Sequence, residues 1–315
     1  LCRVLARRRS DSLINQGSTM ASRRSKCLAW VTRRTMKKKL GASGSVPKER
    51  EMLEKMSGLM SRRTPGPPAT INGVPGEWQY PQTGDGGRTI LYLHGGGYVL
   101  GSPLSHRDMV GGIADAAHAR AFIADYRLGP EHPFPAAVED AVAAYKGLLD
   151  EGFDPAKICI AGDSAGGGLT VAALVSIRDQ KLPLPAAGIC ISPWADLTCS
   201  SGSMTSMADA DPMLRPAALK WMGDLYLNGQ DPKLPLASPI FADLKGLPPL
   251  LIQVGTEEAL YDDAITLSRV AQAAGVDATL EVWEGMMHVW HLMAKLIPEG
   301  KQAMQIIGAF VAAKT

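Results

Sequence analysis

The chain has 315 residues, of which 46% are hydrophobic and 20% are charged, and its formal net charge is +2. This is the composition of an ordinary globular protein, and a chain of this length can bury a large core without a metal or a disulfide. No stretch approaches the roughly 18 consecutive apolar residues of a membrane span, so we expect no stable insertion into a membrane.

The charge is concentrated in a basic segment at the start of the chain. Residues 1–63 carry 17 Lys and Arg against four Asp and Glu, whereas the remainder carries 16 and 27. Such a segment could contact nucleic acid or anionic lipid, but a solvated or partly foreign extension is the simpler interpretation. Met20, followed by Ala21 and Ser22, resembles a natural start. We therefore expect residues 1–45 to be disordered or non-native, and we expect no nucleic-acid partner.

Beyond this segment, short apolar runs alternate with helical patterns. Strands are predicted at 70–74, 76–81, 89–93, 121–124, 158–161, 188–191, 249–254 and 278–283. The main helices are predicted at 103–118, 134–150, 165–180 and 257–274. Buried strands that alternate with helices predict an α/β fold with a mostly parallel, eight-stranded sheet flanked by helices. The ligand crevice of such a sheet lies outside the carboxyl ends of its strands.

Two segments do not fit this alternation and are candidates for a cap. From Pro47 onward, apolar residues fall on one helical face, and Pro212–Leu227 is a second amphipathic stretch inside a long insertion without a clear strand. Long insertions in compact domains are usually functional. We expect residues 46–69 and 197–235 to form a helical cap over a catalytic domain of residues 70–196 and 236–315; an ornamental helix pair is the alternative.

Two glycine-rich motifs indicate acyl-transfer chemistry. Gly-Asp-Ser-Ala-Gly at 162–166 lies between a predicted strand and a predicted helix, which is the setting of a nucleophile elbow, so Ser164 is the candidate nucleophile. His-Gly-Gly-Gly at 94–97 follows another apolar strand, as oxyanion loops of lipases and esterases do. We assign the oxyanion donors to the backbone N–H groups of Gly96, Gly97 and Ala165.

A nucleophilic serine needs a base and an acid that orients the base. His94, His106, His118 and His132 precede Ser164, whereas this fold has the order serine, acid, histidine, which leaves His288 and His291. His288 follows a predicted strand at the expected sheet edge, whereas His291 is expected inside the last helix, so His288 is the candidate general base. The acid should follow strand 249–254, where spacing does not decide among four carboxylates, at positions 257, 258, 262 and 263.

From about residue 70 to 310, the sequence resembles the bacterial hormone-sensitive-lipase-like esterases, a family of the α/β-hydrolase superfamily. The resemblance rests on the motifs at 94–98, 125–136, 162–167, 192–197 and 285–288. The family acid is commonly Asp in Asp-Pro-Leu before an acidic pair; here Glu258-Ala-Leu occupies that place, so the resemblance implies Glu258 as the acid. Because this departs from the commoner Asp, Glu257 and Asp262 stay open.

The resemblance implies a serine carboxylesterase for short- to medium-chain acyl esters that needs no cofactor or metal, with a homodimer possible. We expect Tyr98, Trp194, Met213 and Trp221 to bind the substrate. Amide hydrolysis or deacetylation by the same triad is the alternative, and a ligand-binding role without turnover, as in the similar gibberellin receptors that lack the histidine, is a third. The five cysteines match no metal motif, and two lie in apolar strands, so we expect a cytoplasmic setting.

Overall fold

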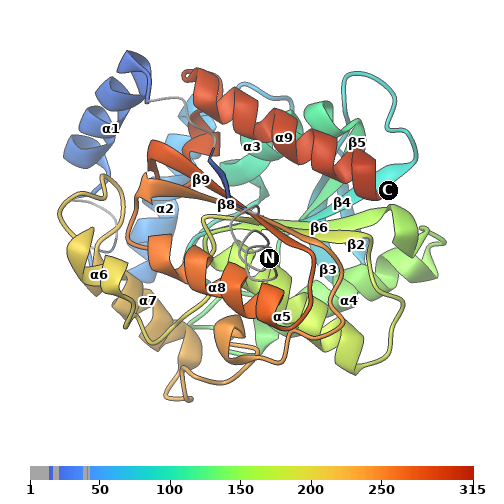
Figure 1. The fold of residues 1–315 in the computed structure, drawn as a ribbon. Coiled ribbons are helices and arrows are strands. Elements are labelled where there is room, and N and C mark those ends of the chain that lie inside the picture. The colour runs from blue at the N-terminus through green and yellow to red at the C-terminus, as the bar shows by residue number, and fades with distance from the viewer. Residues whose placement is uncertain (1–13, 17–20, 38–40, 42) are drawn as a thin grey trace, which may run out of the picture.

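The computed structural model describes residues 14–16, 21–37, 41 and 43–315, and Met20 lies outside these ranges. Its centre is a nine-stranded sheet in the order β1-β9-β8-β7-β6-β4-β5-β3-β2 (Figure 1). The strands are β1 (Ile14–Gln16), β2 (Pro68–Ile71), β3 (Val74–Gln79), β4 (Arg88–Leu93), β5 (Ala119–Ala124), β6 (Ile158–Asp163), β7 (Ala187–Ile191), β8 (Leu250–Glu257) and β9 (Ala278–Met287).

The pairing within the sheet is mostly parallel. All neighbours from β1 to β5 in this order pair in parallel, and only β3 pairs antiparallel with β5 and β2. The predicted α/β fold with its eight strands is thus confirmed, and β1 adds a ninth at the edge beside β9. Sequence patterns missed β1 because three residues in a polar, basic segment give no periodic signal.

Helices cover both faces of the sheet. The helices α3 (Pro103–Ala117) and α9 (Pro298–Lys314) lie on one face, and α4 (Ala136–Asp150), α5 (Ala165–Asp179) and α8 (Tyr261–Ala273) lie on the other (Figure 1). Alternate residues of β4 divide between the two resulting cores, with Ile90 and Tyr92 in one and Leu91 and Leu93 in the other. Central strands buried on both faces are therefore apolar throughout.

Four further helices gather at one end of the molecule, on the left in Figure 1. They are α1 (Arg23–Thr35), α2 (Val46–Met60), α6 (Gly202–Ser206) and α7 (Pro216–Leu227). The last three fall inside the two segments that were predicted to form a cap. Within the described ranges, no helix has the length and apolar composition needed to cross a membrane.

Within residues 1–45, for which a disordered or non-native extension was predicted, the structure describes the helix α1; residues 1–13, 17–20, 38–40 and 42 lie outside the described ranges. Ser22 caps α1 by accepting a hydrogen bond from the Ser25 N–H, and both serines bind Glu299 near the start of α9. Leu28 and Ala29 pack against a cluster that contains Trp283 and Trp290. The segment 23–35 is thus held by tertiary contacts that its basic, polar composition did not reveal.

Two boundaries near the predicted site also differ from expectation. Strand β8 continues to Glu257, which pairs with Met287 across a β-bulge, so β9 extends past residue 283 and α8 begins only at Tyr261. His291 lies in a short 3-10 helix, η3 (Trp290–Met293), and not in α9. The candidate acids at 257 and 258 therefore lie at a strand end rather than in the first turn of a helix.

Candidate active site

The turn between β6 and α5 holds Ser164 in a backbone conformation that few residues other than glycine adopt. Its φ is +54° and its ψ is −121°, and its N–H donates to the Ile191 carbonyl at 2.8 Å. The flanking glycines are required by space: a Cβ on Gly166 would lie 1.9 Å from the Leu93 carbonyl oxygen. Such strain persists only where the surrounding structure enforces it, and it is concentrated at functional sites.

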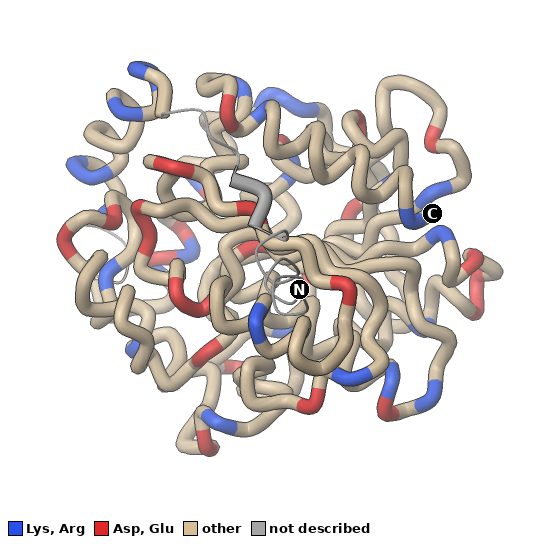
Figure 2. The backbone as a smooth tube through the Cα atoms, viewed as in Figure 1, with Lys and Arg blue, Asp and Glu red and all other residues tan. Residues whose placement is uncertain are grey.

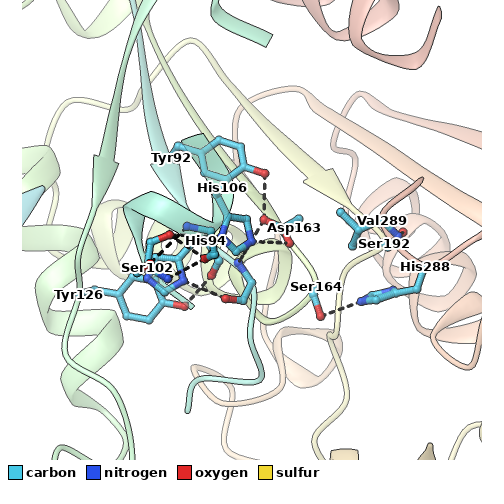
Figure 3. A network of polar contacts seen from close by, with 12 residues as sticks. Tyr92, His94, Ser102, His106, Tyr126, Asp163, Ser164, Ser192, His288 and Val289 are labelled. Atoms are coloured by element: carbon cyan, nitrogen blue, oxygen red, sulfur yellow. Dashed lines mark hydrogen bonds and ion pairs between the residues drawn. The ribbon is translucent and has the colours of Figure 1, made fainter. Parts of the chain in front are cut away.

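Ser164, His288 and Glu258 form one hydrogen-bonded line. The Ser164 Oγ lies 3.0 Å from the Nε2 of His288, and the His288 Nδ1 lies 2.8 Å from the Oε2 of Glu258. All three side chains are buried. Figure 3 shows the serine hydroxyl directed at the imidazole. The segments that carry them follow β6, β8 and β9, so three distant parts of the chain meet at one edge of the sheet.

Glu258 is fixed by more than its contact with histidine. Its Oε1 accepts hydrogen bonds from the Gly255 N–H at 2.6 Å and the Ser192 hydroxyl at 2.9 Å. The Ser192 Oγ in turn accepts from the Val289 N–H at 3.2 Å, next to His288. Ser192 therefore ties the acid to the histidine loop. Sequence reasoning noted the motif at 192–197 without finding this role, because the contact joins three separate strand ends.

No hydrogen bond joins the other candidate acids to the imidazole in the part of the chain that the structure describes. Asp262 accepts a hydrogen bond from the Ser203 N–H, and Asp263 accepts from the Ala195 and Asp196 N–H groups. Glu257 has no contact with the imidazole. Among the carboxylates that the structure describes, only Glu258 lies within hydrogen-bond distance of His288.

The protonation of His288 is controlled by Glu258. Burial disfavours the imidazolium, but the hydrogen bond and the negative charge of Glu258 outweigh it and raise the pKa of His288 above its ordinary value. The ring is thereby poised to accept a proton. His291 differs, because burial lowers its pKa to about 3. Its Nε2 lies 2.8 Å from the Gln253 Oε1, so its hydrogen bond is to Gln253 and not to the Ser164 hydroxyl.

The glycine loop after β4 lines the cavity together with Ser164. Gly96 and Gly97 have φ values of +119° and +63°, and both line the same cavity as Ser164. A Cβ on Gly97 would meet the Met222 sulfur at 2.5 Å. Ala165 is the first residue of α5, so its N–H has no acceptor within the helix. The assignment of these three backbone N–H groups to an oxyanion hole stays a prediction.

A buried polar network centred on Asp163 holds this loop (Figure 3). Asp163 accepts hydrogen bonds from the Tyr92 hydroxyl at 2.9 Å and the Gly95 N–H at 3.1 Å, and the His106 Nε2 lies 3.3 Å from its carboxylate. Burial alone would raise the pKa of Asp163, but the His106 charge and hydrogen bond hold it below the usual range. His106 was not assigned to the site from sequence, because its partner lies 57 residues away.

A cavity of about 1190 Å³ opens above Ser164 and His288. Its walls come from α1, α2, α3, α7, η3 and α9. They are largely apolar, and their members include Leu28, Val31, Met36, Leu53, Met56, Leu59, Met60, Leu100, Leu104, Met109, Met213, Leu214, Leu219, Met222, Leu292, Met293, Leu296 and Met304. The wall from α1 was missed from sequence because that segment was expected to be without structure.

Of the four residues predicted to bind the substrate, one lines the cavity and three do not. Met213 lines the cavity, whereas Tyr98, Trp194 and Trp221 do not. Tyr98 is buried and stacks on Tyr226 with ring centroids 3.9 Å apart, and Trp194 is buried with its indole N–H donated to the Asp196 carbonyl. Trp221 packs against the main core. These three aromatic residues pack within the fold around the site, and their assignment to substrate binding stays a prediction.

No group of three or more His, Cys, Asp or Glu side chains is placed to hold a metal ion in the described ranges. The His288 imidazole can transfer protons and the Ser164 hydroxyl can act as a nucleophile, while backbone N–H groups of the glycine loop could stabilise an anion.

Comparison with known proteins agrees with this geometry. Residues 90–292 match the model of a family described as having the alpha/beta hydrolase fold. An acetyl-hydrolase from Streptomyces hygroscopicus is 52% identical over 251 residues, covering 80% of this chain and 84% of the relative. A crystal structure of EstE5 has a TM-score of 0.89 at 49% identity, covering 93% of this chain and 99% of that one.

An esterase from the bacterial hormone-sensitive lipase family has a TM-score of 0.88 at 47% identity, covering 94% of this chain and 99% of that structure. Coverage is thus nearly complete in both directions, and the family model spans more than half of the chain. The chain belongs to the α/β-hydrolase fold family and, within it, to the hormone-sensitive-lipase-like esterases.

Proposed function

We propose that this protein is a serine carboxylesterase in which Ser164 attacks the ester, His288 transfers the protons and Glu258 orients the histidine. The observation that carries the proposal is the continuous line of hydrogen bonds from the Ser164 hydroxyl through the imidazole to the Glu258 carboxylate. Relatives named as esterases and an acetyl-hydrolase support it. The protein is a carboxylic ester hydrolase, and the residue roles are our assignment.

The reaction would proceed in two halves. The His288 Nε2 takes the proton of Ser164 as its oxygen attacks the ester carbonyl, and the N–H groups of Gly96, Gly97 and Ala165 bind the resulting oxyanion. Collapse of this intermediate expels the alcohol, which takes the proton from His288 and leaves an acyl-serine. Water, deprotonated by the same imidazole, then releases the carboxylic acid. Losing one oxyanion donor typically costs about 2.7–4 kcal/mol of barrier.

We infer from the lining of the cavity that the substrates are small-molecule esters with short to medium acyl chains. It is lined mainly by flexible Met and Leu side chains, which adapt to apolar groups of varied shape. We propose that α2 and the segment 197–235 act as the cap over this cavity, with residues 70–196 and 236–315 as the catalytic domain. Because Leu28 and Val31 also line the cavity, we include α1 in the proposed cap.

Deacetylation is a second candidate, favoured by the relative named acetyl-hydrolase. The same histidine that protonates a departing alcohol can protonate a departing amine. Rates on an ester and on its amide analogue, measured with one preparation, separate the two activities. Faster turnover of the amide would replace the esterase proposal by the deacetylase one.

The test of the proposal is removal of the nucleophile. Ser164→Ala should lower kcat for p-nitrophenyl butyrate by at least about 10⁴-fold, because serine and histidine act as one unit. An organophosphate should label the wild type on the peptide that contains Ser164 and leave the variant unlabelled. Ser176→Ala on the same helix is the control and should keep wild-type kcat. If wild type and Ser164→Ala both hydrolysed the ester only at the uncatalysed rate, the result would instead favour a ligand-binding protein without turnover.

We also propose a reducing, cytoplasmic setting. Cys159 and Cys190 are free thiols buried in β6 and β7, where burial raises the pKa of each to about 12 and makes them inert members of the core. A homodimer stays a prediction, for which the measurement is the sedimentation coefficient of the purified protein.

A further inference from the structure

The opening of the active-site cavity carries an unusual set of exposed apolar side chains. Among the described residues, seven large apolar side chains are exposed, and four of them line this one cavity: Val31, Leu59, Met60 and Leu296. They come from α1, from the end of α2 and from the segment before α9, and Leu59 is 80% exposed. Single exposed apolar residues are normal, but their convergence around one opening marks an interaction site.

The same opening is basic. Helix α1 has five Lys and Arg and no acidic residue, and Figure 2 shows this helix blue and tan with no red. Arg62, Lys295 and Lys301 also line the cavity. Two of the carboxylates that line the cavity are paired with cations: Asp108 pairs with Lys295 at 3.0 Å, and Asp115 pairs with Arg63 at 2.7 Å. We define the rim as the apolar residues Trp30, Val31, Leu59, Met60 and Leu296, the five basic residues of α1, and Arg62 and Lys301. This rim therefore has a surplus of positive charge.

Trp30 extends the rim outward along α1. Its side chain is 56% exposed, and the Arg34 guanidinium lies 3.7 Å above its ring. Tryptophan beside arginine is suited to the boundary between lipid headgroups and acyl chains, where an apolar ring and a cation are both favoured.

We propose that the rim docks peripherally on an anionic lipid surface, with the cavity opening turned toward the acyl chains. Apolar side chains would enter the boundary below the headgroups while Lys and Arg face the anionic phosphates. Two other occupants fit less well. Nucleic acid would use the basic residues and leave the apolar ones unexplained. A second copy of this chain, related by a two-fold axis, would place the two basic rims against each other.

If the protein docks in this way, an ester held in the lipid layer can pass into the cavity without crossing water. This consequence for catalysis rests on the proposed esterase function. The docking itself does not depend on catalysis. Ser164→Ala should therefore bind vesicles as the wild type does. If this variant loses hydrolysis but still binds vesicles, the docking proposal is supported. If the wild type hydrolyses esters but does not bind vesicles, docking is wrong and the esterase proposal is unaffected.

The experiment is flotation of the full chain with vesicles of phosphatidylcholine alone or mixed with phosphatidylglycerol. We expect binding to the anionic vesicles, weakening as NaCl is raised, and a blue shift of tryptophan emission that Trp30→Phe removes. The double variant Trp30→Ser/Leu59→Ser should lower the partition coefficient at least about tenfold, since each side chain loses its burial in lipid. The triple variant Arg23→Gln/Arg24→Gln/Lys26→Gln should lose the salt dependence in part.

Matched controls use exposed residues outside the cavity. Tyr80→Ser/Phe241→Ser removes two exposed aromatic side chains of 50% and 43% exposure, and it should float as the wild type does. Equal binding to both vesicle types, or an equal loss in the control, would overturn the proposal. So would a dimer, seen by sedimentation velocity without lipid, that only the Trp30→Ser/Leu59→Ser variant disrupts, because the rim would then be an interface between two copies.

Discussion

At the scale of the residue, the Glu258 carboxylate accepts three hydrogen bonds, from Gly255, Ser192 and His288. The first two fix its orientation, and the third fixes the tautomer of the imidazole so that Nε2 faces the serine. Each partner comes from a different strand end. A fully buried carboxylate is tolerated here because both of its oxygens accept hydrogen bonds.

The pH dependence of the reaction follows from this pair. Because Glu258 raises the pKa of His288, the ring stays protonated and inactive to a higher pH than a free imidazole would. We expect kcat/KM to rise with pH, with its midpoint above the ordinary value of 6.5 for histidine. Glu258→Gln should move the midpoint to lower pH and reduce kcat by about 10⁴-fold, as the amide favours the wrong tautomer.

The matched control for this measurement is Glu257→Gln. It alters a neighbouring carboxylate that does not contact the imidazole, so the profile should keep the wild-type midpoint and amplitude. If Glu257→Gln shifted the profile and Glu258→Gln did not, the assignment of the acid would be wrong.

Single residues differ in how far sequence can predict them. Ser164 and His288 were predictable, because a glycine-flanked serine between strand and helix and a fixed chain order identify them. Glu258 followed only from the family resemblance, since four carboxylates shared one short stretch. Ser192 and His106 could not be predicted, because their roles arise from contacts between strand ends far apart in the chain.

At the scale of the element, one aspartate joins the proposed cap to the turn that carries the acid. Asp211 lies between α6 and α7 and is fully buried. One carboxylate oxygen accepts from the Met213 and Leu214 N–H groups at 2.7 and 2.8 Å, and the other accepts from the Ala259 N–H at 2.8 Å. The wall of the cavity and the position of Glu258 are thereby coupled.

Asp211→Asn should loosen this link. The amide nitrogen replaces one acceptor and leaves a buried N–H unpaired, which costs about 1–3 kcal/mol of the free energy of unfolding. We expect a lower urea midpoint together with a lower kcat/KM. Asp209→Asn, two residues away and exposed, should change neither quantity. A variant that loses stability while keeping full activity would show that the link does not reach the acid.

Elements were predictable where burial sets a clear pattern. The central strands appeared as apolar runs because helices cover both faces of the sheet, and α3, α4 and α5 began within about two residues of their expected positions. Helix α1 was missed because its anchors, Glu299 and the Trp283–Trp290 cluster, lie at the other end of the sequence. The start of α8 was misplaced because ladder pairing with β9 extends β8 to Glu257.

At the scale of the whole molecule, stability should depend on a carboxyl group outside the catalytic line. Asp263 at the start of α8 is buried and accepts the Ala195 and Asp196 N–H groups. Burial, followed by the charge of Asp196, raises the pKa of Asp263 to about 7. The folded state thus favours the protonated acid, so this contribution to stability is complete below about pH 4 and is lost as the pH rises through about 7.

Asp263→Asn tests this assignment. The amide cannot ionise, so its free energy of unfolding should fall less than that of the wild type between about pH 5 and about pH 7. Urea unfolding of both proteins at the two pH values measures the difference. Asp150→Asn, at an exposed carboxyl, should follow the wild type. Parallel pH dependence of wild type and Asp263→Asn would show that this group does not titrate in that range.

The overall architecture was predictable because alternating strands and helices leave few topologies, whereas the walls of the cavity depend on which distant segments meet. The contact between Ser22, Ser25 and Glu299 has a consequence for biosynthesis. During translation α1 emerges early, but the residue that receives it belongs to the final helix. The wall that α1 contributes to the cavity can therefore be completed only after α9 has left the ribosome, and a chain cut before Pro298 would keep Ser164 but lack the anchor of this wall.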